Sequence, residues 1–346
     1  MGIYSKVVAP TIFALTARDP EPAHRLGILG LKTLAHQPFY GLVKIATQPI
    51  GLATKAFGLE FDTPVGIAAG FDKNAEGVTG ASALGVGHEE VGTIVPRPQQ
   101  GNTRPRLQRM VKQKMLRNWY GFNSAGAPQA ASNLLEARPG TMRVGVNIGA
   151  NKTTPIEEMH NDYVSCIELL HHFASYFSIN VSSPNTPGLR TLQSPERIDR
   201  LLTEVEMKLN EITMRFGRKI PYVVKTANDL PVEATVEVAE RIVARGGAGM
   251  IIGNTRMVTL PNGNPAGESG PPLFDFVGER IEAVKHAFPR LDLVWTGGLD
   301  SPERVWDVLR RGATLCQIYT AMVYEGPFFF HRINSYLLKR HYQQMW

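Results

Sequence analysis

The segment RVGVNIGANKTTPIEEMHNDYVSCIELLHHFASYFSINV, residues 143–181, contains the pattern of a strand, a helix and a second strand in succession. Residues 143–148 and 177–181 are short, mostly apolar and rich in β-branched side chains, whereas residues 161–176 between them have helical spacing. Nearly continuous apolar runs are typical of strands that are buried on both faces of a parallel sheet. The segment therefore predicts a parallel β–α–β unit.

Runs of the same kind recur on both sides of this segment. They lie at residues 65–69, 90–94, 222–225, 249–252, 293–296 and 315–319, and good helical stretches occupy residues 195–216 and 231–245. Together these runs make eight β–α units, which predict a (β/α)8 TIM barrel over residues 49–346. A doubly wound open sheet is the structural alternative, but no G-x-G-x-x-G sequence follows the first strand.

The first 48 residues differ from the rest and are predicted to form a separate N-terminal helical segment. Residues 3–15 and 23–35 each place apolar side chains on one side of a helix. Arg25 and Lys32 lie on the polar side of the second helix, and amphipathic helices with basic polar faces can lie in a membrane interface. Simple packing of both helices onto the barrel fits the pattern equally well.

Composition narrows the classes of partner and cofactor. The net charge of +6 suits nucleic acid, an anionic membrane surface or a small anionic substrate, but the basic residues are dispersed without interleaved aromatics, which argues against nucleic acid. The two cysteines, Cys166 and Cys316, form no CxxC pair, so neither a disulfide framework nor a metal site is expected. No apolar run is long enough to cross a bilayer, and the N-terminus lacks the layout of a signal peptide.

Polar residues or glycines follow all eight predicted strands. They are residues 70–73, Thr93, Asn147, residues 180–185, Lys225, Asn254 with Thr255, Gly297 with Gly298, and Tyr319 with Thr320. In a barrel of this kind the carboxyl ends of the strands form the active-site face, so a wide polar mouth for a large ligand is expected there. The lysines indicate an anion and the paired glycines suit a phosphate, which leaves a phosphosugar isomerase and a flavin enzyme both open.

Six motifs in this order resemble dihydroorotate dehydrogenase. They are PVGIAAGFDKN at residues 64–74, EVGT at 90–93, GNTRPR at 101–106, YGFN at 120–123, GVNIG at 145–149 and NVSSPNTPGLR at 180–190. The resemblance extends over residues 19–327, and the last motif is the most specific. It implies that the chain oxidises dihydroorotate to orotate in pyrimidine biosynthesis, with FMN as cofactor.

The family is divided by its catalytic base. Soluble members use cysteine, whereas the membrane-associated class 2 members use serine and reduce a quinone. This chain has Ser183 at that position, and its N-terminal helical segment independently favours the quinone type. Because the sequence shows neither a targeting segment nor a membrane span, a peripheral enzyme on the cytoplasmic face of a bacterial inner membrane is expected.

The resemblance also implies a role for individual residues. It makes Ser183 the base, gives Lys225 the stabilisation of charge on the reduced flavin, and makes Thr186 and a water near Phe122 candidates for a proton relay. It assigns FMN contacts to Ala68, Ala69, Gly70, Thr93, Asn147, Asn180, Lys225, Thr255, Ser269, Gly270, Gly298, Tyr319 and Thr320. It assigns substrate contacts to Lys73, Asn118, Tyr120, Gly121, Phe122, Asn180, Asn185, Asn254 and Thr255. It assigns the quinone path to His24, Arg109 and Tyr319.

Four positions depart from the family pattern. Ala150 replaces a common lysine, Gly253 a common threonine and Asn228 a proline, and Trp119 follows Asn118 where arginine is expected. The first two changes predict weaker cofactor contacts and leave the base unaltered. Two rival functions are another FMN-dependent barrel oxidoreductase and a catalytically silent membrane-bound flavoprotein. The substrate asparagines argue against the first, and the intact serine and lysines argue against the second.

Overall fold

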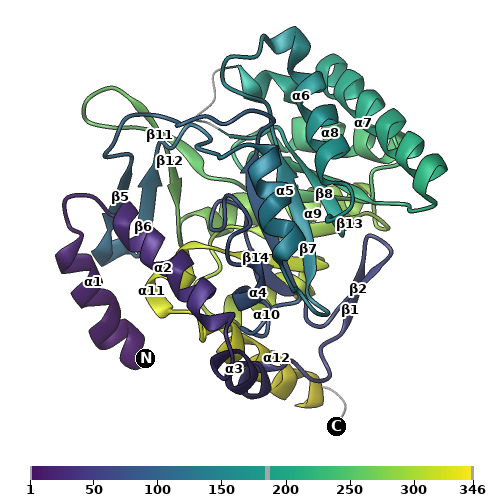
Figure 1. Ribbon diagram of the computed structural model, residues 1–346. Helices are drawn as coiled ribbons and strands as arrows, with labels where there is room; N and C mark the ends of the chain where they lie inside the picture. Colours follow the sequence, from purple (N-terminus) through teal and green to yellow (C-terminus); the bar gives the residue numbers. More distant parts are fainter. Residues whose placement is uncertain (1, 184–187, 344–346) are drawn as a thin grey trace.

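The computed structural model describes residues 2–183 and 188–343, and its centre is a closed barrel of eight parallel strands (Figure 1). Around the barrel the strands are β3 (Val65–Ile67), β4 (His88–Ile94), β7 (Arg143–Ile148), β8 (Tyr176–Asn180), β9 (Tyr222–Thr226), β10 (Gly249–Ile252), β13 (Asp292–Thr296) and β14 (Leu315–Ile318). Strand β14 pairs with β3 and closes the barrel. The (β/α)8 prediction is confirmed, and the open sheet is excluded.

Helices surround the barrel and bury their apolar faces against it. They are α4 (Val78–Ala81), α5 (Ala127–Glu136), α6 (Met159–Leu170), α7 (Pro195–Phe216), α8 (Val232–Ala244), α9 (Leu273–Ala287), α10 (Pro302–Arg310), α11 (Thr320–Glu325) and α12 (Phe329–Gln343). The helix predicted over residues 161–176 ends early, at Leu170. Tyr176 is instead the first residue of β8, because its ring is fully buried against Phe57 inside the barrel.

A second, antiparallel sheet beside the barrel was not predicted. It consists of β5 (Leu107–Met110), β6 (Met115–Asn118), β11 (Arg256–Thr259) and β12 (Pro265–Ser269), in the order β11-β12-β6-β5. Its strands come from two segments far apart in the sequence, one after β4 and one after β10. Figure 1 shows them together at one side of the molecule, next to α1 and α2. A short hairpin of β1 (Thr54–Ala56) and β2 (Leu59–Phe61) precedes the barrel.

The N-terminal segment forms a π-helical turn (Tyr4–Val8), α1 (Ala9–Leu15), α2 (Glu21–Leu34) and a third helix that was not predicted, α3 (Phe39–Thr47). Helix α2 packs closely on α4, since a Cβ at Gly80 would lie 2.0 Å from the carbonyl oxygen of Leu31. Leu26 and Leu29 on the same helix are more than half exposed. The segment thus packs on the barrel with one face and presents apolar side chains on another.

Among the described residues, none of the helices has both the length and the apolar character that a bilayer span requires.

Glu89 is a buried acid on the outer side of β4. Its carboxyl oxygens have no hydrogen-bond partner among the described residues, and burial, reinforced by the nearby Asp72 carboxyl, raises its pKa well above the usual value. The pKa of Glu89 is about 4.5 in the unfolded chain and higher in the folded protein. The protonated side chain therefore contributes its full stabilisation below pH 4.5, and this contribution is lost as the pH rises through the pKa of the folded state. At pH 8 Glu89→Gln should therefore be more stable than the wild type by at least about 1 kcal/mol in urea unfolding, since one pH unit of titration is worth about 1.4 kcal/mol.

Asp72 titrates in the same direction, with a pKa raised by burial to about 6, so the comparison is best made above that pH. Glu60 is an exposed glutamate on β2, and Glu60→Gln serves as the control. Equal pH dependence of stability in Glu89→Gln and the wild type between pH 6 and 8 would contradict the assignment.

Candidate active site

The carboxyl ends of the barrel strands open into a cavity that encloses about 1350 Å³ of free space, its open mouth included. Most of the site residues predicted from the strand ends or from the resemblance line it. These are Ala68, Ala69, Gly70, Lys73, Thr93, Asn118, Tyr120, Gly121, Phe122, Asn180, Ser183, Lys225, Asn254, Thr255, Ser269, Gly270, Gly298, Tyr319 and Thr320. Asn147, His24 and Arg109 do not line it. Asn185 and Thr186 lie outside the described residues, so their predicted roles stay predictions.

Lys225 lies at the inner end of the cavity and is paired with a buried carboxylate. Its Nζ donates to Glu90 Oε1 at 3.1 Å, and both side chains are almost fully buried. Asn147 Nδ2 donates to the same oxygen at 2.8 Å, and Gln317 Nε2 donates to Glu90 Oε2 at 2.7 Å. A buried charge needs a partner and satisfied hydrogen bonds, and Glu90 supplies both to Lys225.

Glu90 is the first residue of the EVGT motif, and the sequence predicted no role for it. Its position within an apolar strand could have indicated an ion pair, because an acidic side chain is rarely buried unless it is paired.

Asn147 lies behind the cavity wall and supports the residues that form it. Thr93 Oγ1 donates to Asn147 Oδ1 at 2.6 Å, and Asn180 Nδ2 donates to Thr93 Oγ1 at 2.8 Å. The three side chains come from adjacent strands β4, β7 and β8. The amide of Asn180 is thereby fixed in orientation where it faces the cavity.

Ser183 follows β8 and is buried, with 5% of its surface exposed. The residue before it is held from three sides. Ser182 Oγ donates to Asn180 Oδ1 at 3.0 Å, Asn254 Nδ2 donates to Ser182 Oγ at 2.8 Å, and Arg190 Nε donates to the Ser182 carbonyl at 3.2 Å. These contacts fix the backbone that presents Ser183 to the cavity.

Lys73 lies across the cavity with its Nζ 3.6 Å from the centre of the Tyr120 ring. The pKa of Lys73 is lowered to about 7, chiefly by burial; the nearby Glu21 acts against this shift and Arg106 adds to it. The Tyr120 hydroxyl and Asn123 Oδ1 are buried and have no hydrogen-bond partner in the part of the chain that the structure describes. Both residues line the cavity, so they can hydrogen-bond to a ligand there.

Phe122 is held in a left-handed backbone conformation, with a φ of +52°. Its ring packs against Gly149, where an added Cβ would lie 3.1 Å from the ring and 2.9 Å from the methyl group of Thr93. Gln99 Nε2 also donates to the Phe122 carbonyl at 2.9 Å. A strained conformation that its surroundings hold in place is common at functional loops.

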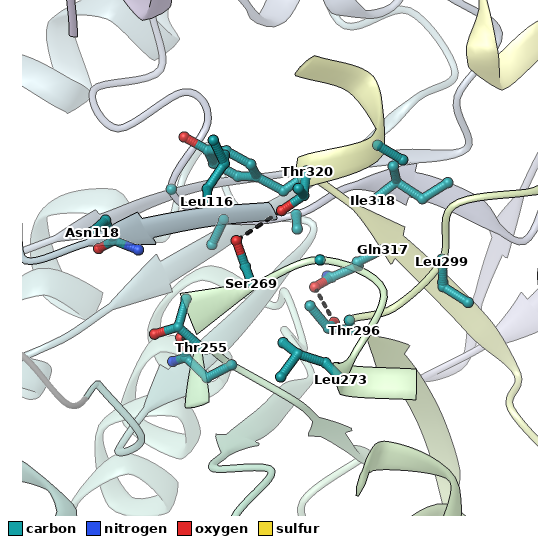
Figure 2. A pocket seen from close by; sticks show the side chains of 18 of the residues that line it. Leu116, Asn118, Thr255, Ser269, Leu273, Thr296, Leu299, Gln317, Ile318 and Thr320 are labelled. Carbon is teal, nitrogen blue, oxygen red and sulfur yellow. Dashed lines mark hydrogen bonds between the residues drawn. The ribbon is translucent and has the colours of Figure 1, made fainter. Parts of the chain in front are cut away.

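One wall of the cavity is lined by backbone and hydroxyl groups. Figure 2 shows Ser269 beside Thr320, whose hydroxyls are 2.8 Å apart, and Thr296 donating to Gln317 at 2.9 Å. Gly297 and Gly298 have φ values of +120° and +74°, which only glycine adopts readily. A Cβ at Gly298 would lie 2.4 Å from the amide nitrogen of Phe274, so the closely packed backbone here leaves no space for a side chain.

The residues predicted for the quinone path connect the N-terminal helices with the cavity. The ring of Phe71 packs edge-on against both His24 on α2 and Tyr319 in the cavity wall. Burial, assisted by the positive charge of Lys73, lowers the pKa of His24 to about 3. Arg109 lies 4.3 Å from the Phe13 ring and lines a second cavity below α1, which shares Leu107 with the first.

The departures from the family pattern have partial structural explanations. Gly253 has a φ of +124°, and a Cβ there would lie 1.8 Å from the Thr296 carbonyl oxygen, so threonine cannot occupy this backbone. Ala150 is fully buried. The Asn228 amide is buried without a hydrogen-bond partner among the described residues, and nothing in the structure explains its replacement of proline. Trp119 is half-buried and lines the second cavity.

Comparison with known proteins agrees with this geometry. The family model described as dihydroorotate dehydrogenase matches residues 51–340. A protein of Shewanella loihica named dihydroorotate dehydrogenase (quinone) is 38% identical over 335 residues, which cover 94% of this chain and 96% of that protein. A protein of the same name from Enterobacter sp. is 39% identical over 334 residues, covering 94% and 97%.

A solved structure of a dihydroorotate dehydrogenase (DHODH) is also similar to this chain. DHODH of Eimeria tenella in complex with ferulenol has a TM-score of 0.84 and 31% identity, and the match covers 94% of this chain and 92% of that one. The chain therefore belongs to the dihydroorotate dehydrogenase family.

Proposed function

We propose that this protein oxidises dihydroorotate to orotate, with FMN as its resident cofactor and a quinone as the final electron acceptor. One observation supports the proposal above the others. A single cavity brings together Ser183, Lys73 and the buried, charge-paired Lys225, although these residues come from three different β–α units. A chance arrangement of solvated loop residues would not place two lysines, one of them buried, beside one serine.

The donor set of the cavity fits FMN. The glycine backbone at residues 297–298 suits a phosphate, and the hydroxyls of Ser269 and Thr320 lie in the same wall. Lys225 at the inner end supplies a positive charge for the ring system. When bound, FMN would supply the hydride-accepting chemistry. The weaker FMN binding expected from Ala150 and Gly253 stays a prediction.

The protein's own residues would then bind and deprotonate the substrate. Lys73 pairs with the carboxylate, and the amides of Asn118 and Asn254 offer both donors and acceptors to the ring amides. Ser183 takes the proton from C5. A serine is a weak base alone, so a relay through Thr186 or a water beside Phe122 belongs to the proposal.

The direct test uses purified protein without oxygen. The protein should be yellow, and adding dihydroorotate should bleach the flavin absorbance and form orotate. A flavin that stays oxidised would remove dihydroorotate as the substrate. Bleaching by another CH–CH donor and not by dihydroorotate would favour the rival FMN-dependent oxidoreductase.

The pKa of Lys73 predicts how substrate binding depends on pH. Because burial lowers that pKa to about 7, the free enzyme loses the positive charge as the pH rises through 7, and the KM for dihydroorotate should rise with it. The bound carboxylate favours the charged lysine, so kcat should change less. Lys73→Arg keeps its charge and should flatten the KM profile between about pH 6 and 9. A profile that is the same in Lys73→Arg as in the wild type would exclude Lys73 as its cause.

We infer that the N-terminal helices dock on a membrane surface, where a quinone would be taken up. Exposed apolar side chains gather on α2 and α3, including Leu26, Leu29, Leu42 and Ile45. Figure 1 shows these helices on the side of the barrel away from α6, α7 and α8. The second cavity, below α1, would then face the membrane with Arg109 in its wall.

Substitution tests the docking surface without removing buried residues. Leu42→Ser with Ile45→Ser should weaken binding to lipid vesicles at least about tenfold, since each apolar side chain contributes roughly 1.5–3 kcal/mol when fully buried. Flavin reduction by dihydroorotate should be unchanged. Met207→Ser with Met214→Ser on α7 is the matched control, because both methionines are also exposed. Equal loss of vesicle binding in both pairs would disprove the assignment of the surface.

A further inference from the structure

A row of three charged side chains crosses the antiparallel sheet beside the active-site cavity. Glu268 on β12 lies opposite Arg117 on β6 and opposite Arg256 on β11. Arg117 Nε donates to Glu268 Oε2 at 2.9 Å, and an Arg256 terminal nitrogen donates to Glu268 Oε1 at 2.7 Å. The side chain of Glu268 is only 3% exposed, whereas the two arginines are about one-quarter to one-third exposed. Both oxygens of the buried carboxylate are therefore satisfied by charged donors.

The three residues directly beside this row in the sequence line the cavity. Asn118 follows Arg117, Thr255 precedes Arg256, and Ser269 follows Glu268. Side chains alternate between the two faces of a strand, so the charged row lies on one face of the sheet and the cavity residues lie on the other. Figure 2 shows Asn118, Thr255 and Ser269 around the same opening.

Only β12 connects the two outer strands of this row. Strands β6 and β11 each pair with β12 and not with one another. The two come from insertions more than a hundred residues apart, after β4 and after β10. Without the carboxylate, two guanidinium groups of like charge would remain on either side of β12 with no common acceptor. Besides the backbone pairing of β12 with β6 and β11, the described side chains of Arg117, Glu268 and Arg256 thus link the strands that carry Asn118 and Thr255.

We propose that the row Arg117–Glu268–Arg256 is a positioning device that sets the spacing of the substrate-binding residues across the cavity. Glu268 is a positioning residue, since it acts through its neighbours and does not line the cavity. The inference rests on the proposed function, because it takes Asn118 and Thr255 as substrate contacts. Small displacements of binding groups have large effects on binding, which makes the idea measurable.

The experiment measures binding of orotate to the FMN-loaded protein by calorimetry, together with turnover of dihydroorotate. Glu268→Gln should weaken orotate binding and raise the KM for dihydroorotate about tenfold, while kcat at saturation changes less than about threefold. Backbone amides of residues 115–118 and 265–269 should exchange hydrogen faster, and amides of the barrel strands should not. Asp199→Asn, which removes the Arg245 ion pair on α7, is the control and should leave orotate binding unchanged.

Arg256→Met removes the more exposed of the two arginines from the row. It is the variant to test if Glu268→Gln fails to fold. It should weaken orotate binding about threefold. Unchanged orotate binding in either folded variant overturns the inference and leaves the proposed function standing. A loss of kcat at an unchanged KM also overturns it. If the wild type itself neither binds orotate nor oxidises dihydroorotate, the proposed function fails first.

Discussion

Replacing Ser183 with alanine is expected to slow reduction of the bound flavin by dihydroorotate at least about 100-fold, which is the lower end of the usual contribution of a positioned acid–base group. FMN should remain bound, because the side chain removed is small and the cavity wall is held by other residues. Asn254 bonds to the Ser182 hydroxyl and Arg190 bonds to the Ser182 carbonyl, and neither bond involves the Ser183 hydroxyl. The measurement is the rate of flavin bleaching after anaerobic mixing in a stopped-flow instrument.

Ser183→Cys distinguishes the loss of a base from a change in the shape of the cavity wall. A thiol of ordinary pKa, about 8.5, should restore part of the rate and make it increase with pH across that value. Ser165→Ala on the exposed side of α6 is the control for a serine hydroxyl that bonds only to its own helix. Flavin reduction at the normal rate in Ser183→Ala would remove Ser183 from the role of base and leave the membership of the family untouched.

The sequence was sufficient to predict the barrel because its strands are buried on both faces. Val146 and Ile179, for example, are fully buried, and such strands read as nearly continuous apolar runs. The antiparallel sheet has no such pattern. Arg117, Arg256 and Glu268 lie within its short strands, where charged residues indicate loops. Only the pairing of distant strands buries Glu268, and local periodicity does not contain that information.

The sequence predicted the site residues at the carboxyl ends of the strands. It did not predict the buried residues inside the barrel that support them. Thr93, Lys225 and Thr255 lie at or just beyond the carboxyl ends of strands, so barrel geometry brings them to one mouth. Glu90, which bonds to Lys225 inside the barrel, was given no role. Asn147 bonds through its amide to Thr93 and Glu90, and the cofactor contact that the resemblance assigns to it stays a prediction. Residue type cannot separate a contact from its support, because both need a polar side chain at the same end of the strand.

Replacing Glu90 with leucine is expected to destabilise the protein by about 3–5 kcal/mol, the usual cost of leaving one member of a buried ion pair without its partner. Lys225 is 4% exposed and could not reach water without opening the barrel. Asn147 and Gln317 would also lose their acceptor. The free energy of unfolding in urea, measured on the FMN-free protein so that cofactor binding does not contribute, gives the size of the loss.

The double variant Glu90→Leu/Lys225→Met tests whether the cost comes from the unpaired charge. It should be more stable than Glu90→Leu alone, because no buried charge remains, and the two substitutions should be clearly non-additive. Lys55 and Glu60 form an exposed pair at 3.5 Å, and Glu60→Leu should change stability by less than about 1 kcal/mol. Additive losses in the double variant would mean that Glu90 and Lys225 act independently. In that case the Glu90–Lys225 pair could not be what holds the Lys225 side chain in place at the inner end of the cavity, where it is proposed to face the flavin ring.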